Sequence, residues 1–232
     1  MAMTFLTLEE PRALERAITS IQHGGVIAFP TDTVYGLGAS LAHPDAMERI
    51  FTIKERNRER TLPVLLASPS DLALVTASVS PALRAMARLF WPGPLTIALP
   101  ALETLPSQVV ASDNTVGVRV PDHSVALTIA QRCGGAIAAT SANISGEPPA
   151  CRGDEIDRTL ADRIDLILDG GIAPCGLPSS VIRPEGDTIV VIREGAIPAA
   201  ALLAAWSRLG DEPDDPSGDH DALVNTGSPA TS

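Results

Sequence analysis

The sequence predicts one α/β domain built on a sizeable mixed sheet. Segments with helical periodicity alternate with short apolar runs typical of buried strands. Some of these strands are separated by short turns and others by helices, which favours a sheet with both parallel and antiparallel neighbours. The chain has 232 residues and is 45% hydrophobic, so it can bury a full core.

The first helix shows how each element is recognised. Pro11 can occupy a first helical turn, Leu14, Ile18 and Ile21 recur at helical spacing, and Gly24-Gly25 marks the end. The same criteria then predict the strand 26–29, a helix from Pro44-Asp45 to the basic run at residue 54, the strand 63–66, helix starts at Ser70-Asp71 and Ser80-Pro81, the strands 95–99 and 116–120, the helix 124–132, the strands 136–139, 164–168, 180–182 and 188–193, and a closing helix 198–206.

The net charge of −11 is unevenly spread. Residues 207–232 contain six acidic residues against one arginine, with Pro, Gly and Ser between them, and this composition predicts a disordered acidic tail. Residues 1–206 form the predicted domain and are still acidic overall, which argues against binding nucleic acid through a broad basic face. A small anionic ligand held by a local basic cluster remains compatible with the composition.

Several classes of protein are disfavoured by simple patterns. Apolar runs are far shorter than the ~20 residues that a membrane-spanning helix needs, and the first ten residues have no basic segment followed by a long apolar one, so neither a membrane protein nor export is expected. Three cysteines without a CxxC pair fit reduced thiols in a cytoplasm. The four histidines are scattered, and no metal site is predicted.

The only lysine, Lys54, opens a basic run that also contains Arg56, Arg58 and Arg60. In an extended segment these four cations would point to one side, an arrangement that suits a polyanion. On a helix only Lys54/Arg58 and Arg56/Arg60 would align, which is typical of a solvated face. The spacing leaves both interpretations open.

Three polar loops follow apolar strands, where open α/β sheets bind ligands. They cover residues 29–38, with the only tyrosine, Tyr35, then 139–146 and 175–182. Their hydroxyl and amide groups could recognise a small polar ligand, although each loop alone could be a turn that satisfies its own backbone. The sequence contains neither a Walker A motif nor GxGxxG.

Taken together, five segments resemble the YrdC-type threonylcarbamoyl-AMP synthases in their short, single-domain form. These segments are Pro30-Thr31-Asp32-Thr33-Val34-Tyr35-Gly36-Leu37, Lys54-Glu55-Arg56, Gly117-Val118-Arg119-Val120-Pro121, Ser141-Ala142-Asn143-Ile144-Ser145-Gly146 and Ser179-Ser180-Val181-Ile182. The resemblance implies a large twisted mixed sheet flanked by helices. It also implies that ATP, L-threonine and bicarbonate become threonylcarbamoyl-AMP, with release of pyrophosphate and water.

The resemblance also assigns roles to residues. It implies that threonine is bound by Thr33, Arg119 and Ser179, and that ATP is bound by Lys54, Arg56, Arg60, Thr115, Ser141, Asn143 and Arg193, of which Lys54 and Arg56 are the catalytic cations. Mg²⁺ is expected to arrive with ATP. Downstream proteins of the cytoplasmic pathway would pass the threonylcarbamoyl group to tRNA.

The chain departs from the family pattern at four positions that bear on substrate contacts: Asn57, Thr61, Leu65 and Pro149. Two other functions stay open. One is an RNA-binding module of the same fold without catalysis, for which the acidic composition predicts only weak tRNA binding. The other is a carbamoyl-adenylate domain that does not use threonine.

Overall fold

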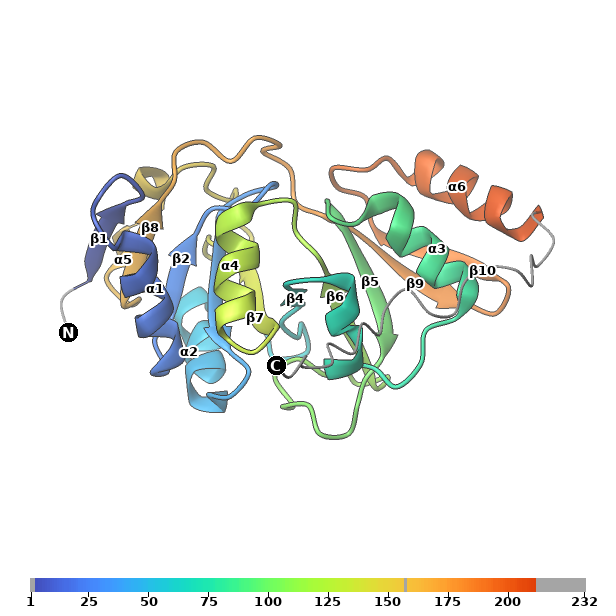
Figure 1. The fold of residues 1–232 in the computed structure, drawn as a ribbon, viewed down its shortest axis with the longest axis horizontal. Helices are drawn as coiled ribbons and strands as arrows, with labels where there is room; N and C mark the ends of the chain where they lie inside the picture. Colours follow the sequence, from blue (N-terminus) through green and yellow to red (C-terminus); the bar gives the residue numbers. More distant parts are fainter. Residues whose placement is uncertain (1–2, 157, 212–232) are drawn as a thin grey trace, which may run out of the picture.

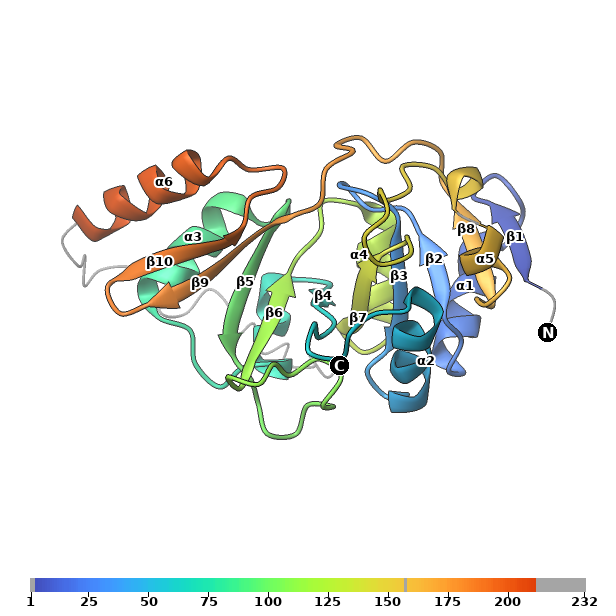
Figure 2. The same cartoon turned by 180° about the vertical axis from the view of Figure 1, so that it is seen from behind.

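The structure, a computed structural model, describes residues 3–156 and 158–211. Within them ten strands form one sheet in the order β1-β8-β2-β3-β7-β4-β6-β5-β9-β10 (Figures 1 and 2). The strands are β1 Thr4–Thr7, β2 Ile27–Phe29, β3 Gly36–Ser40, β4 Val64–Leu66, β5 Leu95–Pro100, β6 Thr115–Arg119, β7 Ala136–Ser141, β8 Leu166–Asp169, β9 Ser180–Glu185 and β10 Thr188–Arg193. The helices are α1 Ala13–Gln22, α2 Pro44–Lys54, η1 Pro69–Leu74, α3 Pro81–Phe90, α4 Ser124–Arg132, η2 Gly153–Glu155, α5 Arg158–Ala161 and α6 Ala199–Asp211.

The sheet is mixed, as the sequence predicts. Strand β8 lies between β1 and β2 and is parallel to both, while β4 is parallel to β6 and β5 to β9. The pairs β2/β3, β3/β7, β4/β7, β5/β6 and β9/β10 are antiparallel. The short turns in the sequence therefore mark antiparallel neighbours, and the parallel pairs have longer connections between them.

Both faces of β2 are covered by helices, because successive side chains of a strand point to opposite faces. Ile27 and Phe29 pack with the apolar residues of α1 and α4, whereas Ala28 packs with those of α2. At the other end of the sheet α3 and α6 pack against each other beside β5 and β10 (Figure 1). Around β2 the sheet is thus a middle layer between helices, whereas α3 and α6 lie on the same face at the other end (Figures 1 and 2).

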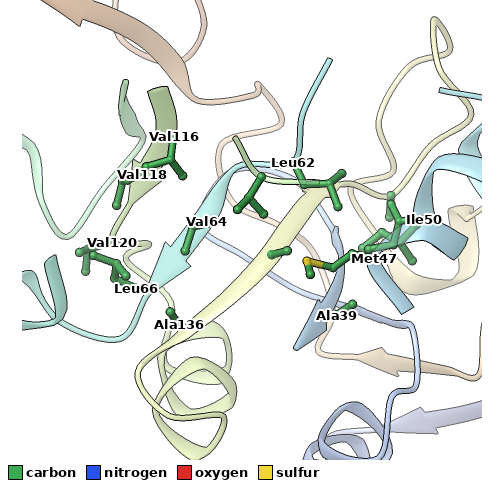
Figure 3. Close-up of a cluster of buried hydrophobic side chains, with 14 of the residues drawn as sticks. Ala39, Met47, Ile50, Leu62, Val64, Leu66, Val116, Val118, Val120 and Ala136 are labelled. Carbon is green, nitrogen blue, oxygen red and sulfur yellow. The ribbon is translucent and has the colours of Figure 1, made fainter. Parts of the chain in front are cut away.

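The larger core cluster links the central strands to α2. Val64 is paired with Val118 across β4 and β6, and both are fully buried. Figure 3 shows these valines in one layer with Leu66 and Val120, and Met47 and Ile50 of α2 lie beside Leu62. Burying a side chain of this size contributes about 1.5–3 kcal/mol, so this layer fixes the strands that carry the site described below.

The helix boundaries follow their capping signals. Ser80 accepts a hydrogen bond from the Leu83 amide and starts α3, as predicted, and α4 has the predicted bounds. The start predicted at Ser70-Asp71 is instead the 3-10 helix η1, capped by Ser68. Its six residues are too few for a stable α-helix without a buried apolar stripe.

Three predictions on the fold need correction. Strands β1 and β3 were not predicted, since Thr4–Thr7 is short and Gly36–Ser40 is rich in Gly and Ala. The polar loop predicted for 29–38 therefore ends at Tyr35. Helix α6 continues to Asp211, past the predicted boundary at 206/207, and the rest of the predicted acidic tail, 212–232, lies outside the described residues.

Candidate active site

A polar cavity lies across the central strands of the sheet. It measures about 120 Å³, less than the ~300–1,000 Å³ of typical pockets for drug-sized ligands, and suits a molecule the size of an amino acid. Its walls come from the β2–β3 loop, from β4, β5, β6 and β7, and from the ends of the β9–β10 hairpin: Thr31, Thr33, Val34, Tyr35, Gly36, Arg56, Pro63, Leu65, Thr96, Arg119, Ala139, Thr140, Ser141, Pro178, Ser179 and Arg193.

Arg119 ends β6 and is almost completely buried at one wall of the cavity. Its Nε donates to the Gly93 carbonyl at 2.9 Å, Nη1 donates to Thr33 Oγ1 at 3.0 Å, and Nη2 donates to the Asp32 carboxylate. Burial lowers the pKa of Arg119, and the charge of Asp32 opposes that lowering. A guanidinium has five N–H groups, so two remain to hold a carboxylate after these three bonds.

Ser179 and Arg193 meet at the open end of the β9–β10 hairpin. Arg193 donates to the Ser179 carbonyl from Nε at 3.1 Å and from Nη2 at 2.8 Å. The Ser179 hydroxyl, which is buried, shares a hydrogen bond of 2.8 Å with Thr96 Oγ1 on β5. Two strands that follow each other in the chain therefore fix a hydroxyl and a cation side by side at the cavity.

Arg56 approaches the cavity from the segment that follows α2. Its Nε donates to the Arg60 carbonyl at 2.6 Å and its Nη2 to the Thr61 carbonyl at 3.1 Å, which closes a compact turn. Burial lowers the pKa of Arg56, and the positive charges of Arg60 and Arg193 lower it further. The cations are thus close enough to repel each other, and an anion placed between them would relieve that repulsion.

Lys54 is the last residue of α2, and its side chain is only 1% exposed. Its Nζ donates to the carbonyl oxygens of Ser141 and Asn143, the latter at 2.6 Å, and lies 3.3 Å from Asn143 Oδ1. Burial, with a smaller effect from the Arg56 charge, lowers the pKa of Lys54 to about 7. Lys54 therefore ties α2 to the loop after β7 and is not part of the cavity wall.

The basic run is neither the extended segment nor the helical face that the sequence left open. Residue Glu55 has a left-handed backbone and ends α2, and the chain then turns. Arg58 points away and forms an ion pair with Glu48. Of the four cations only Arg56 lines the cavity. The turn after Lys54 breaks the alternation that would have placed all four on one side of an extended segment.

The structure brings six of the predicted site residues to the cavity wall: Thr33, Arg56, Arg119, Ser141, Ser179 and Arg193. Lys54 and Asn143 are not in the wall but are bonded to it. Lys54 donates to the Asn143 carbonyl, and the hydroxyl of the wall residue Ser141 donates to Asn143 Oδ1. Arg60 and Thr115 lie outside the wall. Arg60 is exposed. Thr115 lies on the same face of β6 as Gly117 and Arg119, at the far end of the strand, and its hydroxyl donates to Asp113 at 2.7 Å.

The Tyr35 hydroxyl, which the sequence suggested for ligand recognition, instead bonds the turn after β8. Its ring is fully buried, and its hydroxyl lies 2.7 Å from Asp169 Oδ1 and 2.8 Å from the Gly171 carbonyl oxygen, with the Gly170 amide donating to it at 3.0 Å. Burial, followed by the hydrogen bond to Asp169, raises the pKa of Tyr35 above its ordinary value. The phenol anchors the turn after β8.

Among the ten wall residues that the sequence did not assign to a substrate, three have a clear role in the cavity, and one of them, Leu65, is a position where the chain departs from the family pattern. Thr31 shares a hydrogen bond of 3.0 Å with Thr33, Thr96 holds Ser179, and Leu65 supplies an apolar patch. Thr31 belongs to the family motif at residues 30–37, so its position beside Thr33 in the sequence indicated a place in the site. Thr96 gives no such signal, because its role depends on a contact between residues 83 positions apart.

The described residues contain no group of three or more His, Cys, Asp or Glu side chains that could hold a metal ion. Asp32, between the wall residues Thr31 and Thr33, forms an ion pair with Arg119. In the part of the chain covered by the structure, no helix has the length and apolar character needed to cross a membrane.

Comparison with known proteins identifies the family. The sequence profile of the Sua5/YciO/YrdC family, described as telomere recombination, matches residues 19–195. The threonylcarbamoyl-AMP synthase of Pyrococcus abyssi (strain GE5 / Orsay) is 37% identical over 77% of this chain and 52% of its own length. That of Bacillus subtilis (strain 168) is 36% identical over 83% and 56%. The chain thus spans about half the length of these two curated relatives, whereas it covers 91% of the enzyme of Coxiella burnetii (strain RSA 493 / Nine Mile phase I), at 32% identity.

Solved structures agree with the sequence comparison. P. abyssi Sua5 complexed with L-threonine superposes with a TM-score of 0.81 at 32% identity, over 88% of this chain and 61% of that one. Escherichia coli YciO gives a TM-score of 0.76 at 28% identity, over 88% of this chain and all of that one. Profile, relatives and fold point the same way, and they confirm the resemblance in the motifs: this chain belongs to the Sua5/YciO/YrdC family.

Proposed function

We propose that this chain is an L-threonylcarbamoyladenylate synthase, a nucleotidyltransferase that makes threonylcarbamoyl-AMP and pyrophosphate from L-threonine, bicarbonate and ATP. The observation that carries the proposal is the convergence of Arg56, Arg119 and Arg193 on one small cavity lined by hydroxyl groups. Relatives named threonylcarbamoyl-AMP synthase, and a P. abyssi Sua5 structure complexed with L-threonine, support the choice of reaction.

Threonine would occupy the cavity. The two unused N–H groups of Arg119 would hold its carboxylate, and Thr33 and Ser179 offer hydroxyls for its polar groups. Leu65 and Ala139 give an apolar surface for its methyl group. Asp32 would keep the Arg119 guanidinium in place, because it accepts one N–H of Nη2 and leaves the other N–H of that nitrogen for the substrate.

ATP is too large for the cavity and would lie across its open side, with the phosphates toward Arg56 and Arg193. A carbamate oxygen formed from threonine and bicarbonate attacks the α-phosphorus, and pyrophosphate leaves. This step needs no protein nucleophile, but it needs fixed positive charge where the leaving group gains negative charge. Lys54 would act by holding the Ser141–Asn143 loop, which borders the same side.

Mg²⁺ would enter as the complex with ATP, which supplies hard phosphate oxygens. The described residues offer no carboxylate cage for a free ion, so we assign the metal to the nucleotide and not to the protein. The reaction would take place in the cytoplasm, and downstream transfer proteins would move the threonylcarbamoyl group to tRNA. The isolated chain would bind tRNA only weakly, since the described part of the chain has few cations clustered at the cavity.

The test is pyrophosphate release from ATP, with threonine and bicarbonate added separately and together. Release should require both, and the adenylate product should be found by mass spectrometry. Valine in place of threonine should react at a lower rate, because the missing hydroxyl leaves a buried polar group unpaired at a cost of about 1–3 kcal/mol.

Two outcomes would favour the other functions. Release with bicarbonate alone, or equal release with valine, would indicate a carbamoyl-adenylate domain that does not use threonine. Tight tRNA binding without any pyrophosphate release would indicate an RNA-binding module. Either result would contradict the proposal.

A further inference from the structure

Two cysteines lie on loops that touch each other beside the cavity. Cys151 follows the β7 loop, and Cys175 lies in the segment 170–179 that leads into β9. The Ala173 amide donates to the Cys151 carbonyl at 2.7 Å, so the two loops are bonded through their backbones. Both thiols are free in the structure.

The Cys151 side chain points toward the neighbour of Cys175. A Cβ built on Gly176 would stand 3.8 Å from Cys151 Sγ. Consecutive Cα atoms are ~3.8 Å apart, so the Cys175 Cα lies within about 9 Å of that sulfur. Closing a disulfide requires the two Cα atoms to lie within about 7 Å of each other, and it would draw the 170–179 segment toward Cys151.

The segment that must shift also carries part of the cavity. Gly176 donates its amide proton to the Thr33 carbonyl at 2.9 Å, and Pro178 and Ser179 form one wall. Gly171 and Gly176 both have left-handed backbones, with φ of 84° and 68°. Drawing Cys175 toward Cys151 would load the Gly176–Thr33 bond, because the residue next to Cys175 is held by the Thr33 carbonyl.

The two thiols differ in accessibility in the order that a stepwise oxidation requires. Cys175 is exposed, and Cys151 is half-buried behind it. The third cysteine, Cys133, ends α4, and burial raises its pKa to about 11, so little of it is the reactive thiolate near pH 7. The chain therefore contains its own unreactive control.

We propose that Cys151 and Cys175 form a reversible disulfide that switches the site off. With a hydroperoxide as oxidant, the Cys175 thiolate attacks the O–O bond and becomes a sulfenic acid, releasing hydroxide or alkoxide. The Cys151 thiolate then attacks that sulfur, the S–O bond breaks, and the hydroxide that leaves takes a proton from solvent to become water. Two thiols are oxidised to one disulfide while the peroxide is reduced, and a dithiol restores both thiols.

The first test is independent of the reaction. The full chain is treated with a small excess of hydrogen peroxide, alkylated, digested without reductant and mapped by mass spectrometry. A Cys151–Cys175 cross-link should form while Cys133 remains alkylated, and dithiothreitol should remove the link. A Cys175 that stops at sulfinic acid, or links that join two chains or include Cys133, would overturn the pairing.

The second test rests on the proposed function. Peroxide should lower pyrophosphate release at least about tenfold, and dithiothreitol should restore it. The variants Cys151→Ser and Cys175→Ser should match the untreated parent and resist inactivation, with Cys133→Ser still sensitive. A cross-link that forms without a change in rate would overturn the switch. An untreated parent without any release would instead refute the proposed function, and the cross-link map would still decide the pairing.

Discussion

Replacing Lys54 with methionine tests whether this buried lysine is a latch between α2 and the loop after β7. Methionine has a similar length and no charge, so the α2 packing should survive. The variant loses the bonds from Nζ to the Ser141 and Asn143 carbonyls. We expect pyrophosphate release to fall about a hundredfold, the scale expected when a change away from the reacting atoms misplaces a positioning group by about 1 Å.

The effect on stability should depend on pH, and its sign follows from the pKa. In the unfolded chain the lysine keeps its proton up to about pH 10.5, whereas folded Lys54 releases it at about 7. Between these values the unfolded state binds more protons, so the free energy of unfolding should rise with pH, by at most about 1.4 kcal/mol per pH unit. Below pH 7 both states are protonated, and the full cost of burying the charge remains.

The assay is urea unfolding of the parent and of Lys54→Met between pH 6 and about pH 10. The difference between the two free energies removes the contribution of other groups that titrate in this range. This difference should grow in favour of the parent as pH rises. The control Arg58→Ala, which removes an exposed cation, should show the same pH dependence of the free energy of unfolding as the parent. Parallel pH curves for parent and Lys54→Met would refute the reasoning, since the carbonyl oxygens would then compensate the ammonium fully.

Three further predictions concern the cavity and its surroundings. Arg119→Lys should raise the KM for threonine at least about tenfold, because an ammonium has three N–H donors where the guanidinium has five for Gly93, Thr33, Asp32 and a bidentate carboxylate; an unchanged KM would remove Arg119 as the carboxylate clamp. Tyr35→Phe should lower the free energy of unfolding by about 1–3 kcal/mol in urea titrations and keep pyrophosphate release, since its hydroxyl serves the turn at Gly170; loss of release at normal stability would contradict that role. Binding of tRNA, followed by fluorescence anisotropy, should be weak and fade steeply as salt rises, and tight salt-insensitive binding would instead favour an RNA-binding module whose contacts to tRNA are not mainly ionic.

The fold could be predicted from the sequence wherever local signals agreed. Helices α1, α3 and α4 have capping residues or glycine stops together with a clear apolar period. Strand β3 had none of the usual signals, because its glycines and alanine suit close packing: a Cβ on Gly38 would stand 2.9 Å from the Phe29 ring. That requirement comes from a neighbouring strand and is not visible in the segment itself.

The sequence predicted which segments form the site, but not which of their side chains face the cavity. The motifs located Thr33, Arg119 and Ser179, which meet at the cavity. The direction of the Lys54 side chain could not be predicted. It points to the Ser141–Asn143 loop, and the turn at Glu55 that follows leaves Arg56 to face the cavity. Whether a side chain lines a cavity or braces it from behind depends on contacts between segments nearly 90 residues apart.

The place of β8 in the sheet has a consequence for synthesis on the ribosome. Strand β1 is made well before its partner β8, which separates it from β2. The N-terminal strand therefore has no neighbour to pair with until residues 166–169 have left the exit tunnel. Contacts over such long sequence separations slow folding, and the first strand stays an open edge, available to chaperones, while more than 150 further residues are added.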